Sequence, residues 1–314
     1  MAYLMIPCIV LFGIEANSLS LPDRLETTKI KFYKEDFKMK LLKPLLGTLL
    51  IAGVLSVNSA SAGAVLDKIM SNKTIKVATD ANWPPQSFIN DNNEMDGFDV
   101  DVAREIAKRL GAEVEFITPN WDVITAGNWY GRWDMHVGSM TPTKQRAEVL
   151  SFPAVYYYTP AAVAVHKSSK VSEVSGLSGM KIGTGTGTTF ELYLSQDLVI
   201  DAAGAPEFDY QIDNPVVKSY ETSVVALDDL RLGDGVRLDG VLSSLPTILE
   251  AIENGYPLKV VGAPVFYEPL AVTVDLGDNE LNAKIASIVA AMRADGSLTT
   301  ISKKWYGVDY ATVK

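Results

Sequence analysis

The pattern that most restricts the fold is an alternation of short apolar strands with amphipathic helices, which occurs twice after residue 62. In the first unit, residues 75–79 alternate apolar and polar side chains, which predicts a strand. Residues 99–110 carry apolar side chains at i+4 spacing, which predicts a helix that ends at Gly111. Further strands are predicted over 114–117 and 133–139.

A second unit repeats this arrangement. It comprises a strand over 180–183 with a loop of Gly and Thr over 184–189, a helix from Phe190, a strand over 236–242 and a helix over 246–254. The end of the chain carries an amphipathic segment over 280–305 that is interrupted at Gly296. Strands that alternate with helices predict an α/β fold with mainly parallel sheets, and two such units predict two lobes. Ligands of such sheets bind at loops beyond the carboxyl ends of the strands.

The first 62 residues differ from the rest. A short basic segment over 39–43 precedes an apolar run over 45–57, and Ala60-Ser61-Ala62 follows. This order predicts a cleavable signal peptide from Met39 to Ala62, because the run is too short to span a membrane. Residues 1–38 then either result from a start codon that was assigned too far upstream or form an authentic extension. We expect an exported chain that begins at Gly63.

Composition excludes several classes of function. A chain with a net charge of −10 repels the phosphates of nucleic acids, so no nucleic-acid partner is expected. Cys8 is the one cysteine, so the exported chain lacks cysteine, as suits an oxidising compartment. The glycines of 183–187 lack the spacing of a dinucleotide loop, and His136 and His166 are expected to be structural. We therefore expect neither a metal nor another cofactor.

Loops after the predicted strands carry groups suited to a small anion. Residues 138–141, which include Ser139, Met140 and Thr141, follow a strand, and Arg146 comes five residues later. The planar guanidinium of arginine matches a carboxylate with two parallel hydrogen bonds. A second set, Thr188 and Thr189, opens a predicted helix. The alternative for the arginine is a surface salt bridge with a neighbouring acid.

Aromatic residues occupy similar positions. Trp83, Phe88 and Trp121 lie in loops after strands, where flat faces line pockets for apolar or planar parts of ligands. Their alternative position is the core. Asp80 precedes this group and could offer a carboxylate to a ligand cation, or it could serve as a turn or cap residue.

Five motifs in sequence order resemble the polar amino-acid-binding proteins of the bacterial periplasm, the family 3 solute-binding subunits of ABC importers. The motifs are the aromatic-proline loop 83–88, the helix 97–107, the segment 134–153, the second-unit loop 181–189 and the C-terminal segments 292–296 and 304–307. The resemblance implies a two-lobe clamshell that closes on its ligand by a hinge motion. Lobe 1 would take 63–159 and 265–314, and lobe 2 would take 160–264.

The same resemblance implies roles for individual side chains. Arg146 and Thr141 would hold the α-carboxylate of the ligand, and Thr188 and Thr189 would reach it from the other lobe. Ser139 would lie near the ammonium group. The side chain of the ligand would be sandwiched by two indoles, with a carboxylate at its polar end; these residues are Trp83, Trp121 and Asp80.

One position departs from the family pattern. The resemblance places an acid for the ligand ammonium at residue 244, where this chain has Ser244. A buried ammonium without a countercharge is costly. Either Asp80 or Glu221 serves instead, or the ligand has no free α-ammonium.

The sequence therefore predicts a periplasmic, monomeric binding protein that captures an amino acid or a related small carboxylate and passes it to an ABC permease in the inner membrane. No catalysis is expected, because no pair of nucleophile and base is evident. The first alternative is an exported enzyme on the same scaffold, similar to cyclohexadienyl or arogenate dehydratases. The second is an extracellular sensor module, whose usual fused membrane or signalling domain is missing from the sequence.

Overall fold

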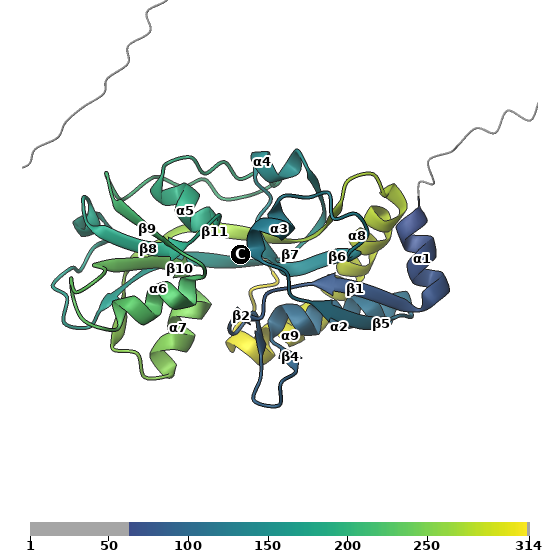
Figure 1. Cartoon of the computed structure of the whole chain (residues 1–314), viewed down its shortest axis with the longest axis horizontal. Coiled ribbons are helices and arrows are strands. Elements are labelled where there is room, and N and C mark those ends of the chain that lie inside the picture. Colours follow the sequence, from purple (N-terminus) through teal and green to yellow (C-terminus); the bar gives the residue numbers. More distant parts are fainter. Residues whose placement is uncertain (1–62, 313–314) are drawn as a thin grey trace, which may run out of the picture. The chain divides into compact units, whose positions relative to one another are not determined.

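The structure is a computed structural model that describes residues 63–312 (Figure 1). The expected signal peptide and upstream extension lie outside the described residues. In the part of the chain that the structure describes, no helix is both long enough and apolar enough to cross a membrane.

Helices and strands alternate through most of the described chain. The helices are α1 (Ala64–Asn72), α2 (Phe98–Leu110), α3 (Trp121–Thr125), α4 (Lys144–Ala147), the 3-10 helix η1 (Val174–Leu177), α5 (Thr189–Leu194), α6 (Ser223–Leu230), α7 (Leu245–Glu253), α8 (Asn279–Ala294) and α9 (Ser297–Tyr306). The strands are β1 (Thr74–Ala78), β2 (Asn82–Trp83), β3 (Ser87–Ile89), β4 (Met95–Asp96), β5 (Glu113–Ile117), β6 (Met135–Met140), β7 (Leu150–His166), β8 (Lys181–Gly185), β9 (Val216–Tyr220), β10 (Gly240–Ser244) and β11 (Leu258–Asp275).

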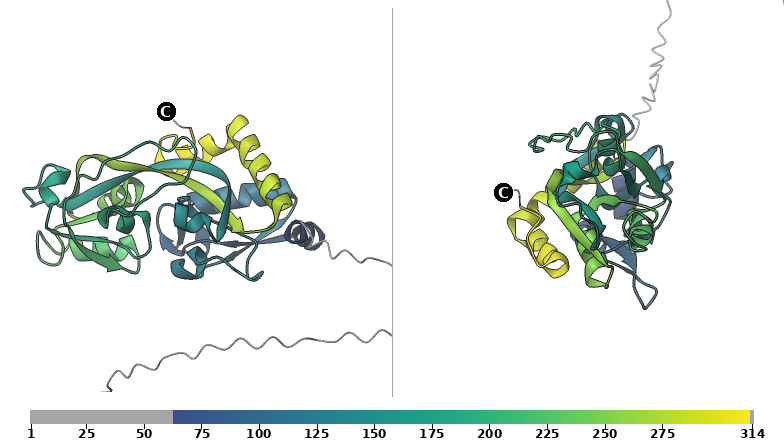
Figure 2. Two further views of the ribbon diagram at one scale, coloured as in Figure 1. Left: turned by 90° about the horizontal axis from the view of Figure 1, so that it is seen from above. Right: turned by 90° about the vertical axis from the view of Figure 1, so that its left-hand side faces the viewer.

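Eight of these strands form one sheet in the order β5-β1-β6-β11-β7-β10-β8-β9, and β2, β3 and β4 form a small separate sheet. The two flanks, β5-β1-β6 and β10-β8-β9, are parallel as predicted. The centre is antiparallel, because the long strands β7 and β11 pair with each other and with both flanks. Figures 1 and 2 show these two strands running side by side from one flank to the other. The expectation of mainly parallel pairing is therefore wrong for the middle of the sheet.

Buried side chains divide into groups along β7 and β11. Tyr157 of β7 and Leu270 of β11 pack in a core with α2, α8 and α9. Val163 of β7 and Phe266 of β11 pack in another core with α5. We call the part of the chain around the first core lobe 1 and the part around the second lobe 2. The lobe limits predicted at 159/160 and 264/265 lie close to this transition and stay a prediction.

Helix α2 follows its sequence pattern closely. Phe98, Val102, Ile106 and Leu110 are all buried, and Gly111 ends the helix with a left-handed backbone (φ 69°). The strand predicted over 236–242 instead begins at residue 240. The residues before it form turns around two glycines with positive φ, which overrides the apolar alternation there.

Candidate functional site

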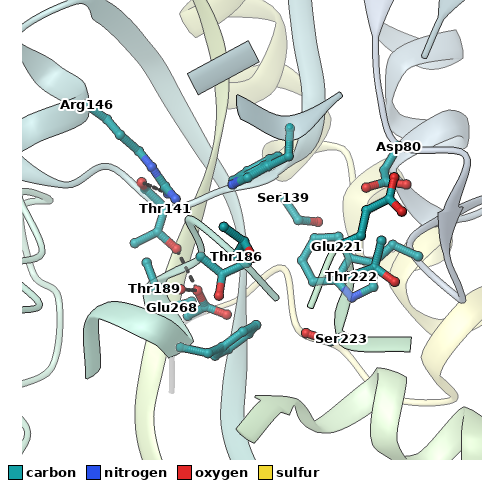
Figure 3. A pocket seen from close by; sticks show the side chains of 14 residues that line it. Asp80, Ser139, Thr141, Arg146, Thr186, Thr189, Glu221, Thr222, Ser223 and Glu268 are labelled. Carbon is teal, nitrogen blue, oxygen red and sulfur yellow. Dashed lines mark hydrogen bonds between the residues drawn. The ribbon is translucent and has the colours of Figure 1, made fainter. Parts of the chain in front are cut away.

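A pocket lies where loops of both lobes meet strand β11 (Figure 3). The cavity left free between its lining side chains is about 50 Å³. The loops follow the carboxyl ends of β1, β6, β8 and β9, as expected for a sheet of this kind.

Arg146 on α4 is the cation of the pocket. Its Nη1 donates to the carbonyl of Thr141 (2.9 Å) in lobe 1, and its Nη2 donates to the carbonyl of Gly187 (2.9 Å) in lobe 2. The guanidinium lies over the ring of Trp121, 5.1 Å from the ring centre. Burial lowers the pKa of Arg146 to about 10, so the side chain stays charged at neutral pH. A guanidinium has more N–H groups than these two carbonyls use, so donors remain for a ligand.

The carbonyl of Gly187 joins the two lobes at this point. It accepts from Arg146 and also from the indole Nε1 of Trp121 (3.1 Å). Gly187 has a left-handed backbone (φ 69°), and a Cβ atom there would lie 3.5 Å from the indole of Trp121. Glycine is suited to this turn because it adopts positive φ without strain.

Glu268 on β11 lies beside these groups and is 2% exposed. Its Oε1 accepts from the hydroxyl of Thr141 (2.9 Å) and from the hydroxyl of Thr189. Its Oε2 is buried and has no hydrogen-bond partner among residues 63–312. Burial raises the pKa of Glu268 to about 7, although the two hydroxyls and the charge of Arg146 act in the opposite direction.

Ser139, at the end of β6, has a strained left-handed backbone (φ 57°). Its N–H donates to the hydroxyl of Tyr156 (2.9 Å), and its own hydroxyl donates to Asp99 Oδ2 (2.7 Å). Tyr156 donates to the other oxygen of Asp99 (2.6 Å). Burial raises the pKa of Asp99 to about 7 despite these bonds. A buried acid on α2 therefore fixes the backbone at the base of the pocket.

Asp80 and Glu221 lie together on the side of the pocket away from Arg146 and Glu268 (Figure 3). Asp80 Oδ1 accepts from the N–H of Asn82 (2.7 Å), as in the turn considered from the sequence. Burial raises the pKa of Asp80, and the nearby charge of Glu221 adds to this effect. Trp83 also lines the pocket, and its buried Nε1 has no hydrogen-bond partner in the described part of the chain.

Comparison with known proteins identifies the family of this chain. Residues 75–308 match the model of the bacterial extracellular solute-binding proteins, family 3. This chain belongs to that family. Among curated relatives, it is 27% identical over 263 residues to the L-cystine-binding protein TcyJ of Escherichia coli strain K12 (83% of this chain, 92% of the relative). It is 28% identical over 239 residues to ABC transporter arginine-binding protein 1 of the same strain (74% and 90%).

Solved structures agree with this family assignment. An ancestral arginine-binding protein bound to arginine is 29% identical, with a TM-score of 0.64 over 75% of this chain and 99% of that one. The ancestral amino acid-binding protein AncCDT-1, a precursor of cyclohexadienyl dehydratase, is 26% identical with a TM-score of 0.66 (77% and 99%). The predicted two-lobe solute-binding fold is thus confirmed.

Most residues that the sequence suggested for this solute-binding protein do line the pocket. They are Asp80, Trp83, Trp121, Ser139, Thr141, Arg146, Thr188 and Thr189. Their individual roles toward a ligand stay predictions. Thr188 also caps α5, because its hydroxyl accepts from the N–H of Glu191 (3.3 Å), and it donates to the carbonyl of Gly185 (2.7 Å).

Three suggested residues lie elsewhere. Phe88 packs edge-on against Trp305, with ring centres 6.0 Å apart. Met140 is buried in a separate cluster with Ala78 and Trp129, because successive residues of β6 point to opposite faces of the sheet. Ser244 does not line the pocket; its hydroxyl is hydrogen-bonded to the side chains of Gln86 (2.9 Å) and Thr247 (2.9 Å).

Other lining residues were not among those suggested as ligand contacts. They are Thr186, Phe190, Glu221, Thr222, Ser223 and Glu268, of which Glu221 was considered as a substitute acid. Glu268 had a signal in the sequence, because it is the one charged residue in the apolar stretch 260–274. A charge in a buried strand requires a partner or a function. His136 is buried behind Trp121 (ring centres 5.9 Å apart), and burial lowers its pKa to about 3.

Proposed function

We propose that this protein is the periplasmic binding component of an ABC importer, and that it captures an amino acid or a related small carboxylate between its lobes. The observation that carries this proposal is Arg146, a buried and charged guanidinium at the junction of the two lobes with N–H donors left for a carboxylate. The named relatives, which bind cystine and arginine, support an amino-acid ligand. The ligand would pass to a permease in the inner membrane.

The polar walls of the pocket favour a ligand with charges at both ends. Arg146 and Glu268 lie on one side, and Asp80 and Glu221 lie on the other. The indoles of Trp83 and Trp121 also line the pocket and supply flat apolar surface. A basic or otherwise polar amino acid matches this distribution of charge, with its α-carboxylate at Arg146.

Closure of the lobes around the ligand is part of the proposal. β7 and β11 connect the lobes, and we place the hinge in these strands near 159/160 and 264/265. Arg146 and Trp121 of lobe 1 contact Gly187 of lobe 2 directly. A ligand that binds both lobes stabilises this closed arrangement relative to an open one.

The proposal is tested by calorimetric titration of the purified protein with amino acids and small carboxylates. We expect one or a few amino acids to bind, and Arg146→Ala to weaken binding by at least about 30-fold, because a buried charge partner is lost. Arg146→Lys should also bind weakly, since lysine lacks the planar fork. Arg146→Ala should further cost about 1–3 kcal/mol of stability, because two carbonyls lose their donor.

Arg132→Ala is the matched control. Arg132 also stacks on an indole, Trp133, at 4.8 Å, but it does not line the pocket. Its variant should keep the affinity. Undiminished affinity in Arg146→Ala would exclude the carboxylate assignment.

An exported dehydratase is the second candidate. The observation in its favour is Glu268, a buried carboxyl with a pKa raised to about 7 in the pocket, because a general acid works best with a pKa near the ambient pH. Incubation with a cyclohexadienyl carboxylate such as arogenate, followed by ultraviolet absorbance of an aromatic product, tests it. Binding without product formation supports the importer component alone.

A further inference from the structure

Glu268 Oε2 is a buried acceptor that the described residues leave without a donor. It belongs to a residue that lines the pocket and is 2% exposed. Water cannot freely solvate an oxygen at this depth, so an ionised Glu268 needs a hydrogen-bond donor from inside the pocket.

The other oxygen of Glu268 limits what its neighbours can do. The hydroxyls of Thr141 and Thr189 each carry one hydrogen, and both donate it to Oε1. Neither hydroxyl then has a hydrogen left for a ligand carboxylate. These two threonines therefore fix the orientation of Glu268 and leave Oε2 for the ligand.

Glu268 and Arg146 are both hydrogen-bonded to Thr141. Thr141 accepts from Arg146 through its carbonyl and donates to Glu268 through its hydroxyl. The buried cation of Arg146 and the buried carboxylate of Glu268 are thus linked through Thr141 at the same end of the pocket. This pair matches the head of an α-amino acid, in which a carboxylate and an ammonium are attached to one carbon.

We propose that Glu268 binds the ammonium group of the ligand and thereby makes the pocket selective for α-amino acids over carboxylates that lack a nitrogen cation. This inference rests on the proposed function. Ser244 carries no charge and is engaged by Gln86 and Thr247 in hydrogen bonds of 2.9 Å each, so it does not supply the countercharge. The carboxylates of Asp80 and Glu221 stand on the other side of the pocket.

The inference predicts a link between binding and protonation. An ammonium group favours the ionised form of Glu268, whose pKa burial raises to about 7, so binding near pH 7 should release a fraction of a proton. Affinity should rise with pH from about 5.5 to 8, by up to about tenfold per unit below the pKa. The other charged groups of the pocket are Arg146, Asp80 and Glu221, and Asp99 titrates behind Ser139.

The experiment compares pairs of ligands that differ in the α-ammonium alone. They are L-arginine with 5-guanidinopentanoate, and L-cystine with 3,3′-dithiodipropionate. The purified protein and its Glu268→Gln variant are titrated with each by calorimetry at pH 7 in two buffers of different ionisation enthalpy. Glutamine keeps an oxygen for the two threonine hydroxyls and loses the charge, and a melting curve checks its folding.

We expect the unsubstituted protein to bind at least one amino acid about 30-fold or more tightly than its partner without the ammonium. In Glu268→Gln this preference should fall below about tenfold, and the proton release should disappear. Glu221→Gln, which removes an acid from the other side of the pocket, should keep both. Asp99→Asn should also keep the preference. This variant distinguishes the titration of Asp99 from that of Glu268, since both carboxyl groups have a pKa of about 7.

The possible failures are distinguishable. If the unsubstituted protein binds the amino acid and its partner equally well, or if Glu268→Gln keeps the full preference, the role of Glu268 is excluded and the proposed function stands. If no amino acid binds at all in a wider screen, both proposals are excluded.

Discussion

Thr141 has one hydroxyl hydrogen, and the site depends on which acceptor takes it. The sequence places Thr141 and Arg146 near a ligand carboxylate, and both do line the pocket. The hydroxyl of Thr141 donates to Glu268, which lies 127 residues away along the chain. No local pattern indicates a partner so distant, so residue type and position could be predicted while the hydrogen-bond direction could not.

Single residues of β6 show a similar limit. Ser139 and Thr141 of the segment 138–141 line the pocket, but Met140 faces the core. Alternation along a strand decides this, and it can be applied only when one facing residue is already known. Glu268 shows the opposite limit. The sequence marks it as an isolated charge in an apolar stretch, but it does not indicate where in the fold that stretch lies.

Asp99 allows a prediction on pH and stability. The pKa of Asp99 is raised from 3.8 to about 7 in the folded protein, so between these values the folded state binds more protons than the unfolded state. Its contribution to stability is present at low pH and is lost as pH rises to about 7, by up to about 1.4 kcal/mol per unit. Relative to the unsubstituted protein, Asp99→Asn should therefore gain stability between pH 5 and pH 7 and change no further above pH 7.

Urea unfolding of the ligand-free protein at several pH values measures this difference. Glu253→Gln is the control, because Glu253 is an exposed carboxylate at the end of α7. A stability difference for Asp99→Asn that is the same at pH 5 and pH 8 contradicts the prediction.

At the scale of elements, prediction succeeded where one pattern dominates. The i+4 stripe of α2 and the break at Gly296 between α8 and α9 are found in the structure. β7 and β11 were not foreseen as strands of 17 and 18 residues. Each is apolar on both faces over much of its length, because helices or loops of both lobes cover it, and a continuous apolar run carries no periodicity.

The pairing of β7 with β11 yields a prediction at this scale. The register shifts between Val261 and Phe266, and Gly262 in this interval has φ 65°. A Cβ atom there would lie 2.7 Å from Val174 Cγ2. Gly262→Ala should therefore destabilise the protein by about 2 kcal/mol or more.

Gly111→Ala provides the comparison. Its backbone is nearly the same (φ 69°), but a Cβ atom there meets nothing within 4 Å in the described structure. Chemical unfolding of both variants separates backbone strain from the clash with Val174. Equal losses would show that η1 moves aside without cost.

For the molecule as a whole, contacts between the lobes determine how firmly they close. The indole Nε1 of Trp121 crosses to the carbonyl of Gly187, and the N–H of Asp201 crosses to the carbonyl of Pro142 (2.9 Å). The proposed opening of the lobes would exchange these bonds for bonds to water. Each is worth about 0.5–1.5 kcal/mol net.

Trp121→Phe keeps an aromatic face in the pocket and removes the donor to Gly187. We expect ligand affinity to fall about three- to tenfold, because the closed state loses one hydrogen bond. Trp305→Phe is the control, since the indole of Trp305 donates to Asp101 (2.8 Å) within lobe 1. Calorimetric titration measures both, and equal affinities in the two variants would show that the Trp121 bond does not contribute to closure.

The two long strands, β7 and β11, also determine the order in which the cores of the two lobes can form during synthesis. Lobe 2 is inserted between the first part of lobe 1 and its last helices, so Val77 of β1 and Ile285 and Leu298 of α8 and α9 share one core. The early strands emerge from the ribosome long before the helices that cover them. The core of lobe 1 therefore cannot be completed until translation is nearly finished, whereas the residues of the lobe 2 core are all synthesised earlier.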